Sequence, residues 1–344
     1  MSAGIGHCIV FPGPGEVVIE EFVIPEPGPG QILLQAHHSL ISAGTELTNL
    51  TDALGIAEYP LQPGYSHVGA VIARGDGAPE DFPVGTAVLS MGPHSSHIIL
   101  EPSTGAAAGE HIAGNQFALP IPPGIDLAEA TFAILGSVAM HAVRIARPEL
   151  GQSAAVFGQG VVGQLIVQLA RATGCRPVIA LDLDNARLAL ACESGATATV
   201  NPDSEDPVER LLELTDGRGV DLLFDATRTP ATLPTMLKAA AHSARILVTG
   251  SLPGKVEIDL CHELQVREIS IIGVFQPATP IVAHPYNPWT QSRNRATFLQ
   301  MLAAGDLPIA HLISSTPTYR EATAVYRAIQ QGPGDWLGII FDWG

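Results

Sequence analysis

The 344-residue sequence has few charged residues, and positive charge is scarcer than negative charge. Lysine and arginine number 17 against 34 aspartates and glutamates, which gives a formal net charge of −17. A surface this acidic repels nucleic-acid phosphates and anionic lipid headgroups, so neither nucleic acids nor membranes are expected partners. Hydrophobic residues make up 46% of the chain and charged residues only 15%, a balance that favours folded domains over disorder.

Paired cysteines and long apolar runs are also lacking. The four cysteines, Cys8, Cys175, Cys192 and Cys261, are scattered and form no C-x-x-C pair. We therefore expect free thiols rather than a disulfide framework or a zinc cage. No apolar run reaches the ~18 residues needed to span a bilayer, and the N-terminus lacks the pattern of a secretory signal. Together these features predict a cytoplasmic protein of about two domains.

The most informative segment contains three closely spaced glycines. Small and apolar residues at 154–157 lead into Gly158-Gln159-Gly160-Val161-Val162-Gly163, and an amphipathic run follows. This order predicts a buried strand, a tight turn and a helix, the context in which G-x-G-x-x-G binds a dinucleotide. The free N–H groups and the positive dipole end of the helix are expected to hold the pyrophosphate.

An acidic residue supports the same interpretation. The apolar run 177–181 ends at Asp182, which is 19 positions after Gly163 (182 − 163). A carboxylate at about this distance accepts hydrogen bonds from the adenosine ribose of NAD and repels the 2′-phosphate of NADP. The sequence therefore predicts an NAD site. The alternative is an ordinary strand–helix–strand unit with a surface aspartate.

The chain divides into regions with different periodicity. Residues 1 to about 120 contain short strands between Pro/Gly turns, which predicts a compact β-rich barrel or sandwich. Asp126 is expected to cap a helix at its start, with Glu129 three residues later. From Gly151 onward strands alternate with helices, which predicts a doubly wound parallel sheet. We place its six strands at 154–157, 177–181, 197–200, 222–225, 245–249 and 269–275, and its helices at 161–173, 184–194, 206–215 and 231–241.

The alternation stops after Phe275. A stretch rich in proline and aromatic residues, 277–290, leads into an expected helix over 291–304. A second helix is expected near 319–331, followed by a closing strand over 336–343. This last part of the chain is predicted to return to the first domain.

With these features in place, the chain resembles the medium-chain dehydrogenase/reductase superfamily, relatives of zinc alcohol dehydrogenases and quinone reductases. The turn and strand at 27–34, the glycine turn, Asp182 and Arg187 carry the resemblance, which covers essentially the whole length. It implies an α/β fold with a GroES-like catalytic domain (1–135 and 277–344) and a six-stranded Rossmann domain (136–276). It also implies that Thr249 and Gly250 belong to the NAD site, and that edge strand 269–275 forms a homodimer.

The superfamily's zinc ligands have no counterpart at two positions. Zinc-dependent members carry Gly-x-Cys-Gly-Ser/Thr-Asp where this chain reads Ile41-Ser42-Ala43-Gly44-Thr45-Glu46. Their Gly-His-Glu corresponds to Gly64-Tyr65-Ser66, and no cysteine lies between Cys8 and Cys175. Zinc requires converging nitrogen, sulfur or oxygen ligands, so we expect a metal-free site. The Ser-Ala-Gly-Thr-Glu segment is similar to a zinc-less branch that includes bacteriochlorophyllide dehydrogenase-like proteins.

Without zinc, side chains must stabilise the substrate alkoxide and move its proton. Tyr65 is a candidate donor to the substrate oxygen, although its pKa near ~10 must fall for it to act as a base. By the resemblance Thr45 relays a proton, while Glu46 and His67 are acid–base candidates. Each also has a plain structural interpretation: a packed tyrosine, a turn threonine, a surface carboxylate and a hydrogen-bonded histidine.

A second group of polar and aromatic residues is expected to bind the substrate. His94 and His97 suggest a loop that lines the substrate site, in preference to a metal site completed by His67 or Glu101. The remaining candidates follow the last expected strand: Gln276, His284, Tyr286, Trp289 and Arg293. Aromatic rings there are suited to stack on a ring, and an arginine to bind a carboxylate or phosphate. The alternative is a loop at a dimer interface.

These expectations combine into one function with two competitors. The favoured one is a zinc-independent NAD(H)-dependent oxidoreductase that transfers hydride between nicotinamide and a secondary alcohol or ketone of a polar or ring-bearing small molecule. The second is an enone or quinone reductase using NAD(P)H, against which Asp182 counts. The third is a non-catalytic nucleotide-binding protein of the same fold.

Overall fold

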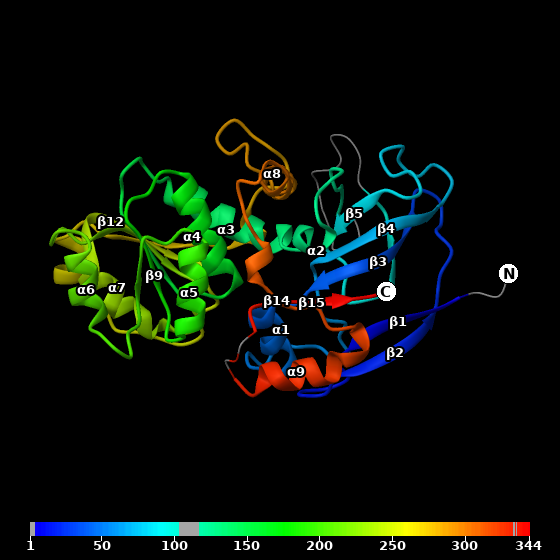
Figure 1. Ribbon diagram of the computed structural model, residues 1–344, viewed down its shortest axis with the longest axis horizontal. Helices are drawn as coiled ribbons and strands as arrows, with labels where there is room; N and C mark the ends of the chain where they lie inside the picture. Colours follow the sequence, from blue (N-terminus) through cyan, green and yellow to red (C-terminus); the bar gives the residue numbers. More distant parts are fainter. Residues whose placement is uncertain (1–3, 103–116, 333, 335) are drawn as a thin grey trace. The chain divides into compact units, whose positions relative to one another are not determined.

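The computed structural model describes residues 4–102, 117–332, 334 and 336–344. The chain forms two compact units (Figure 1). The first contains Met1–Leu135, Thr279–Gly305 and Ile313–Gly344; the second contains Gly136–Ala278 and Asp306–Leu312. The predicted α/β class is confirmed, with a parallel sheet in the second unit and a mixed sheet in the first.

The second unit is built on a six-stranded sheet in the order β10-β9-β8-β11-β12-β13, and every neighbouring pair is parallel. Its strands are β8 (Ala154–Phe157), β9 (Val178–Leu181), β10 (Ala198–Val200), β11 (Val220–Asp225), β12 (Ala240–Val248) and β13 (Ser270–Gly273). β8 and β9 are buried along their whole length, as expected of strands covered on both faces. The chain order reverses direction between β8 and β11, so the sheet is doubly wound as predicted.

Helices cover both faces of this sheet (Figure 1). They are α3 (Ala133–Ala146), α4 (Val161–Ala172), α5 (Asn185–Glu193), α6 (Pro207–Glu213) and α7 (Leu233–Ala239), with short helical turns at η3 (Pro230–Thr232), η4 (Leu260–Gln265) and η6 (Ala310–Leu312). Leu211 of α6 and Met236 of α7 are fully buried in one apolar cluster with the strands. Local sequence starts α6, because the Asp206 side chain accepts the N–H groups of the first turn and Pro207 follows it.

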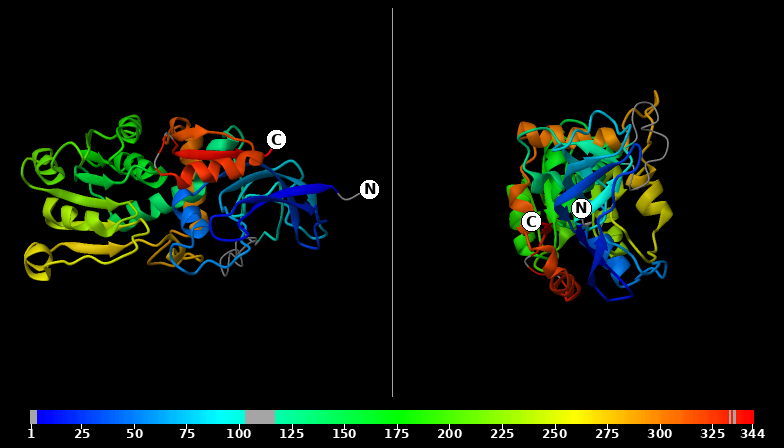
Figure 2. Two further views of the ribbon diagram at one scale, coloured as in Figure 1. Left: turned by 90° about the horizontal axis from the view of Figure 1, so that it is seen from below. Right: turned by 90° about the vertical axis from the view of Figure 1, so that its right-hand side faces the viewer.

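The first unit contains a mixed seven-stranded sheet and a separate antiparallel pair (Figure 2). The pair is β1 (Ile5–Val10) with β2 (Val18–Val23). The sheet runs β14 (Ile313–Ser315), β15 (Gly338–Asp342), β3 (Ile32–Leu40), β4 (His67–Arg74), β5 (Ala87–Ser90) and β7 (Ala118–Pro120), and β6 (His97–Leu100) also pairs with β3. Because β15 lies beside β3, the C-terminal strand closes the N-terminal sheet, as the sequence predicts.

The helices of the first unit are α1 (Ala43–Leu50), α2 (Leu127–Ala130), α8 (Gln291–Ala304) and α9 (Ala322–Gln330), with a helical turn at η7 (Tyr319–Glu321). Another helical turn, η5 (Gln276–Ala278), ends the longer segment of the second unit. The helix predicted over 291–304 is confirmed with the same bounds. Asp126 caps α2 as predicted, accepting the N–H groups of Ala128 and Glu129. One prediction is wrong: the helix expected over 231–241 ends at Ala239, because Ala240 already belongs to β12.

Two further features concern the cysteines and the length of the helices. All four cysteines are free, with Cys8 and Cys175 buried and the other two exposed. In the described residues, no helix combines the length and apolar character needed to cross a membrane.

Candidate functional site

The glycine turn of the second unit places its three glycines in three different environments. Gly158 follows β8 with φ +86°, a conformation that glycine adopts without strain. A Cβ on Gly163 would lie 1.9 Å from the carbonyl oxygen of Gly158, so α4 packs too closely on the turn for any side chain. A Cβ on Gly160 would meet no described atom within 4 Å. Gly160 is therefore the point at which a ligand can approach the backbone.

The start of α4 is suited to an anion. Gly160 is the N-cap residue, and no side chain of the described chain caps it. The first-turn N–H groups of Val161, Val162 and Gly163 thus lie at the positive end of the helix dipole without a side-chain acceptor. Buried Gln159 donates from Nε2 to the carbonyl of Val156 at 2.8 Å, while its Oε1 has no partner among the described residues. The first-turn N–H groups of α4 are therefore suited to bind a pyrophosphate.

Asp182 follows β9 and fastens the glycine turn. Its Oδ2 accepts the N–H of Gln159 at 2.6 Å, and its Oδ1 accepts the N–H of Asp184 at 3.0 Å. A carboxylate oxygen has more than one lone pair, so both oxygens keep capacity to accept a ribose hydroxyl. Asp182 thus has a structural role that its spacing did not reveal, beside the ligand contact that its spacing predicts.

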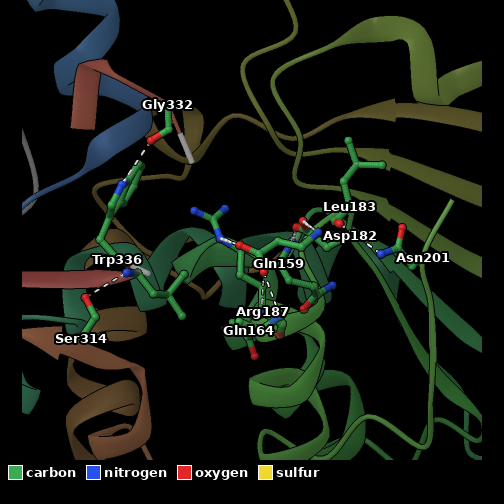
Figure 3. A network of polar contacts seen from close by, with 12 residues as sticks. Gln159, Gln164, Asp182, Leu183, Arg187, Asn201, Ser314, Gly332 and Trp336 are labelled. Atoms are coloured by element: carbon green, nitrogen blue, oxygen red, sulfur yellow. Dashed lines mark hydrogen bonds and ion pairs between the residues drawn. The ribbon is translucent and has the colours of Figure 1, made fainter. Parts of the chain in front are cut away.

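Arg187 and its neighbours join the helices to the strand ends (Figure 3). The Arg187 carbonyl accepts from Gln164 Nε2 on α4 at 2.9 Å, and its guanidinium Nε lies 3.7 Å from Asp184 Oδ2. Asn201 Nδ2 donates to the carbonyl of Leu183 at 3.0 Å. The residues around the glycine turn are therefore held by both backbone and side-chain contacts.

Thr249 and Gly250 lie at the same carboxyl edge of the sheet, directly after β12. Their N–H groups both donate to the Asp225 carbonyl, at 2.9 and 2.7 Å. A Cβ on Gly250 would lie 2.0 Å from the carbonyl oxygen of Thr227. The sheet thus brings Gly158–Gly163, Asp182, Thr249 and Gly250 to one edge at the switch point, where open α/β sheets bind their ligands.

The segment after β11 belongs to this edge and was missed by the sequence analysis. The carbonyl oxygen of Ala226 lies 3.0 Å from the position of a Cβ on Gly158, and the Thr227 Cγ2 lies 3.1 Å from it. The buried Asp225 carboxylate fixes this segment by accepting from the N–H and hydroxyl of Thr227 and from the hydroxyl of Thr232. One feature of the sequence could have identified this segment: Ala226 and Thr227 directly follow a predicted strand next to the switch point.

In the first unit, three hydroxyl groups gather at the start of α1. Ser42 is the N-cap residue of α1, Thr45 lies in its first turn, and Tyr65 precedes β4. The Tyr65 phenol donates to Ser42 Oγ and lies 3.3 Å from Thr45 Oγ1. Thr45 is exposed and Ser42 is buried, so the three hydroxyls, which we call the hydroxyl cluster, lead from the surface inward. The structure thus brings Tyr65 and Thr45 together and adds Ser42.

The protonation state of Tyr65 limits its chemistry. Burial raises the pKa of the Tyr65 phenol, and the nearby charge of Glu46 raises it further, whereas the hydrogen bonds to Ser42 and Thr45 lower it. Burial is the largest of these effects, so the phenol stays protonated at neutral pH. For Tyr65 to act as a base, its pKa would have to be lowered, and it is raised. The structure supports the other role, in which a neutral phenol donates and relays a proton.

Glu46 is buried beneath the hydroxyl cluster. Its Oε1 accepts the N–H of Ser42 at 2.7 Å, and its Oε2 lies 3.1 Å from His94 Nε2 and accepts from the Tyr326 phenol. Its exposed fraction is 1%. The surface interpretation of Glu46 is therefore wrong, and the direct acid–base role is replaced by that of a group that orients Ser42. Burial and the charge of Glu46 raise the pKa of Tyr326.

His94 does not lie where a substrate-binding residue is expected. It is fully buried, and its ring nitrogens contact Ser39 Oγ at 2.7 Å and Glu46 Oε2 at 3.1 Å. The ring also packs edge-on against Phe341. Because both nitrogens are engaged inside the unit, we reassign His94 from the substrate-binding candidates to the buried network under α1.

His67 and His97 have different surroundings. His67, the first residue of β4, is fully buried with Nδ1 3.2 Å from Ser90 Oγ, and burial lowers its pKa to about 3. It is neutral at physiological pH, which makes it a poor acid. His97 is partly buried, contacts Ser96 Oγ at 3.0 Å, and has a pKa lowered by burial. It lines a cavity of about 330 Å³ with Phe22, Gln62, Met91, Ser95 and Ile99.

The segment 276–293 is largely exposed. His284 and Tyr286 are exposed at its tip, and the Tyr286 side chain is 96% exposed. The Arg293 guanidinium stacks on the Trp289 ring at 4.0 Å and donates to the Pro288 carbonyl at 3.1 Å. Gln276 is half-buried, and its Nε2 has no partner in the described part of the chain. Trp289 and Arg293 are thus already paired, whereas the next arginine, Arg295, is fully buried.

The donor set at the hydroxyl cluster does not fit zinc. Ala43 has no donor atom, and the Tyr65 phenol is committed to Ser42 with a raised pKa. Zinc in proteins is held by thiolate, imidazole or carboxylate groups. Within the described ranges, no three such side chains come together. Neutral hydroxyl groups therefore lie in the segments where the sequence resemblance implies zinc ligands.

The chain is similar in sequence to known dehydrogenases. Residues 161–288 match the zinc-binding dehydrogenase family. The L-threonine 3-dehydrogenase of Pyrococcus horikoshii is 27% identical over 349 residues, covering 93% of this chain and 94% of that protein. The sorbitol dehydrogenase of Bacillus subtilis is 25% identical over 338 residues, covering 92% and 91%.

A solved structure shows the same fold over the whole length. The putative zinc-binding dehydrogenase of Sinorhizobium meliloti, solved with NADP bound, has a TM-score of 0.82 at 22% identity and covers 98% of this chain and 99% of its own. The fold, with a Rossmann sheet and a mixed-sheet domain, is thus the one seen in this solved structure. This agreement confirms the fold that the sequence resemblance implied.

Proposed function

We propose that this protein is a zinc-independent, NAD(H)-dependent oxidoreductase that interconverts a secondary alcohol and a ketone on a polar or ring-bearing small molecule. The observation that carries the proposal is the hydroxyl cluster, Thr45–Tyr65–Ser42, which lies in the segments where the sequence resemblance implies zinc ligands. Relatives named as threonine and sorbitol dehydrogenases support an oxidoreductase that acts on alcohols.

The second unit supplies the cofactor site in this proposal. The Gly160 backbone and the first turn of α4 would hold the pyrophosphate, and Asp182 would accept the adenosine ribose hydroxyls. The bound nicotinamide supplies the acceptor or donor of a hydride. NAD is proposed over NADP because the Asp182 carboxylate, already fixed by two N–H groups, would repel a 2′-phosphate.

The hydroxyl cluster supplies the proton path. The Tyr65 phenol accepts the proton of the substrate alcohol as it passes its own proton to Thr45 Oγ1, 3.3 Å away, and exposed Thr45 releases one proton to water. Each hydroxyl releases one proton as it accepts another, so Tyr65 never has to ionise fully. In the direction of ketone reduction the same groups return the proton to the substrate oxygen. Buried Glu46 is a positioning residue, because its carboxylate accepts the backbone N–H of Ser42.

Three further expectations remain part of the proposal. The exposed Phe275 and Val266 flank the edge strand β13, which supports a homodimer formed through 269–275. The four free cysteines suit a reducing cytoplasm. Domain boundaries at 1–135, 136–276 and 277–344 would separate a substrate-binding part from a cofactor-binding part.

The proposal is tested first by cofactor binding. NADH titrated into the purified protein should enhance nicotinamide fluorescence, and NADPH should bind at least about tenfold more weakly because of the Asp182 carboxylate. A panel of secondary alcohols with NAD should then yield NADH absorbance, and turnover should persist after dialysis against a zinc chelator. Absence of NADH binding would refute the proposal. Tight binding without turnover would instead favour a nucleotide-binding protein, and chelator-sensitive turnover would refute zinc independence.

A further inference from the structure

Arg295, in the second turn of α8, is a fully buried cation without a countercharge in the described chain. Its side chain is 0% exposed. Nη2 lies 3.0 Å from Met91 Sδ and 3.3 Å from Gln291 Oε1, both uncharged groups. Nε and Nη1 have no partner among the described residues. Such a group is destabilising unless something pairs with it, because the charge has lost its hydration.

The surroundings compensate only in part. The Phe117 ring presents its face to the guanidinium at 4.1 Å, a favourable but weak contact for a cation. Burial lowers the pKa of Arg295 to about 10, and no charge of the described residues opposes that shift. The guanidinium is still protonated at neutral pH. It therefore keeps a full positive charge and unused N–H groups inside the first unit.

Arg295 contacts a residue that lines a cavity, and that residue lies at the same end of the mixed sheet as Tyr65. Met91, which accepts from Arg295, also lines the cavity of about 330 Å³. Met91 directly follows β5, whose last residue Ser90 is paired with His67 at the start of β4. Tyr65 comes just before that same strand end. The guanidinium and the hydroxyl cluster therefore belong to one end of the mixed sheet.

We propose that Arg295 binds an anionic group of the substrate, a carboxylate or a phosphate, and so selects acidic hydroxy compounds over neutral alcohols. Guanidinium N–H groups match the oxygens of both anions, and the ligand's charge would supply the missing countercharge. This inference rests on the proposed function and names its substrate class. Arg295 replaces Arg293 in the role expected from the sequence, since Arg293 is stacked on Trp289 at the surface.

Direct anion binding tests the site without turnover. Thermal unfolding is followed with sodium acetate or sodium phosphate, with sodium chloride holding the ionic strength constant. We expect one of the two anions to raise the Tm of the wild-type protein, which identifies a carboxylate or a phosphate site. Arg295→Met should abolish the shift, Arg295→Lys should reduce it, and Arg327→Met, at an exposed arginine of α9 in the same unit, should keep it.

The same experiment separates a binding role from a structural one. If Arg295 lacks a partner in the protein, Arg295→Met removes an uncompensated charge and its Tm without added anion should equal or exceed that of the wild type. A lower Tm would show that the protein itself pairs with Arg295 and would overturn the proposal. So would equal responses of Arg295→Met and wild type to the anions, or no response of the wild type to either.

Kinetics complete the test with matched substrates. Racemic 2-butanol is compared with 3-hydroxybutyrate, and sorbitol with sorbitol 6-phosphate, at saturating NAD. We expect kcat/KM of the preferred acidic substrate to fall roughly 100-fold in Arg295→Met, with little change for its neutral partner. Equal losses for both members would overturn the anion role. If NADH binds and neutral alcohols react as well as acidic ones in the wild type, the substrate class is wrong while the proposed function stands.

Discussion

The Tyr326 phenol on α9 donates a hydrogen bond to the Glu46 carboxylate on α1, across 280 positions of sequence. The same oxygen of Glu46 lies 3.1 Å from His94 Nε2, and the other oxygen holds the N–H of Ser42. One buried carboxylate thus ties the C-terminal helix to the start of α1, where the hydroxyl cluster lies. The position of these hydroxyls therefore depends on a contact with the end of the chain.

Removing the charge of Glu46 should destabilise the first unit. Glu46→Gln replaces one of the two accepting oxygens by an NH2 group, so the side chain can no longer accept at both the Ser42 and the Tyr326 contacts. Leaving a buried donor without its acceptor typically costs about 1–3 kcal/mol of unfolding free energy. Chemical denaturation of Glu46→Gln should show this loss. Glu213→Gln, which breaks the exposed pair with Arg210, is the matched control and should cost less than about 1 kcal/mol.

His67 should make the protein less stable as pH falls. Its pKa is about 3 when folded and near 6.5 when unfolded, so between these values the unfolded chain binds the additional proton. The stability from neutral His67 is present above pH 6.5 and is lost progressively towards pH 3. Between pH 7 and pH 5 the loss should be about 2 kcal/mol. In His67→Gln, which keeps a polar contact for Ser90, the loss of unfolding free energy between pH 7 and pH 5 should be smaller by about 2 kcal/mol. An unchanged loss would contradict a neutral, buried His67.

Parts of this site that depend on local contacts could be predicted from the sequence, whereas parts that depend on contacts between distant residues could not. The glycine turn is a local structure, so the spacing of Gly158, Gly160 and Gly163 sufficed to predict strand, turn and helix. The burial of Glu46 depends on His94 and Tyr326, which are 48 and 280 positions away. No local pattern contains that information, and a glutamate in isolation is usually a surface residue.

Arg293 and Arg295 show the same limit within one helix. Both lie in a segment that the sequence correctly predicts to be helical, two positions apart and therefore on different sides of the helix. Which side faces the core is decided by Met91 and Phe117, which come from distant strands and loops. The helix was predictable from periodicity, whereas the choice between the two arginines required the fold.

Substitutions in the hydroxyl cluster should reduce turnover without affecting the cofactor. Tyr65→Phe removes the first hydroxyl of the relay, and Thr45→Val removes the exposed one with little change in shape. General acid–base groups typically contribute about 100- to 10,000-fold, so we expect kcat losses in this range for either variant. NADH affinity should stay within about twofold, since the glycine turn is unaltered. The double variant should be little slower than the single ones, because the two hydroxyls act in one path; additive losses would contradict a shared relay.

Asp182 should affect both cofactor choice and the stability of the turn. Asp182→Asn keeps an acceptor oxygen but removes the negative charge. NADH should bind about tenfold more weakly, while NADPH binding should weaken less or improve, so that the preference between the two narrows. Because Asp182 also accepts the N–H groups of Gln159 and Asp184, a modest loss of about 1–2 kcal/mol in stability should accompany the change. Isothermal titration with each cofactor and a denaturant curve measure the two effects separately.

The two helix-side glycines of the turn should respond differently to the same added methyl group. Gly160→Ala places a Cβ where no described atom lies within 4 Å, and the φ of Gly160 is −69°, which alanine tolerates. This variant should fold with nearly wild-type Tm but bind NADH at least about tenfold more weakly, because the methyl group occupies the approach to the backbone. Gly163→Ala should instead lower the Tm, because its Cβ would lie 1.9 Å from the Gly158 carbonyl oxygen and force α4 away from β8. Fluorescence titration and thermal unfolding of the two variants separate these effects, and an unchanged NADH affinity in Gly160→Ala would show that the open side of Gly160 is merely exposed surface.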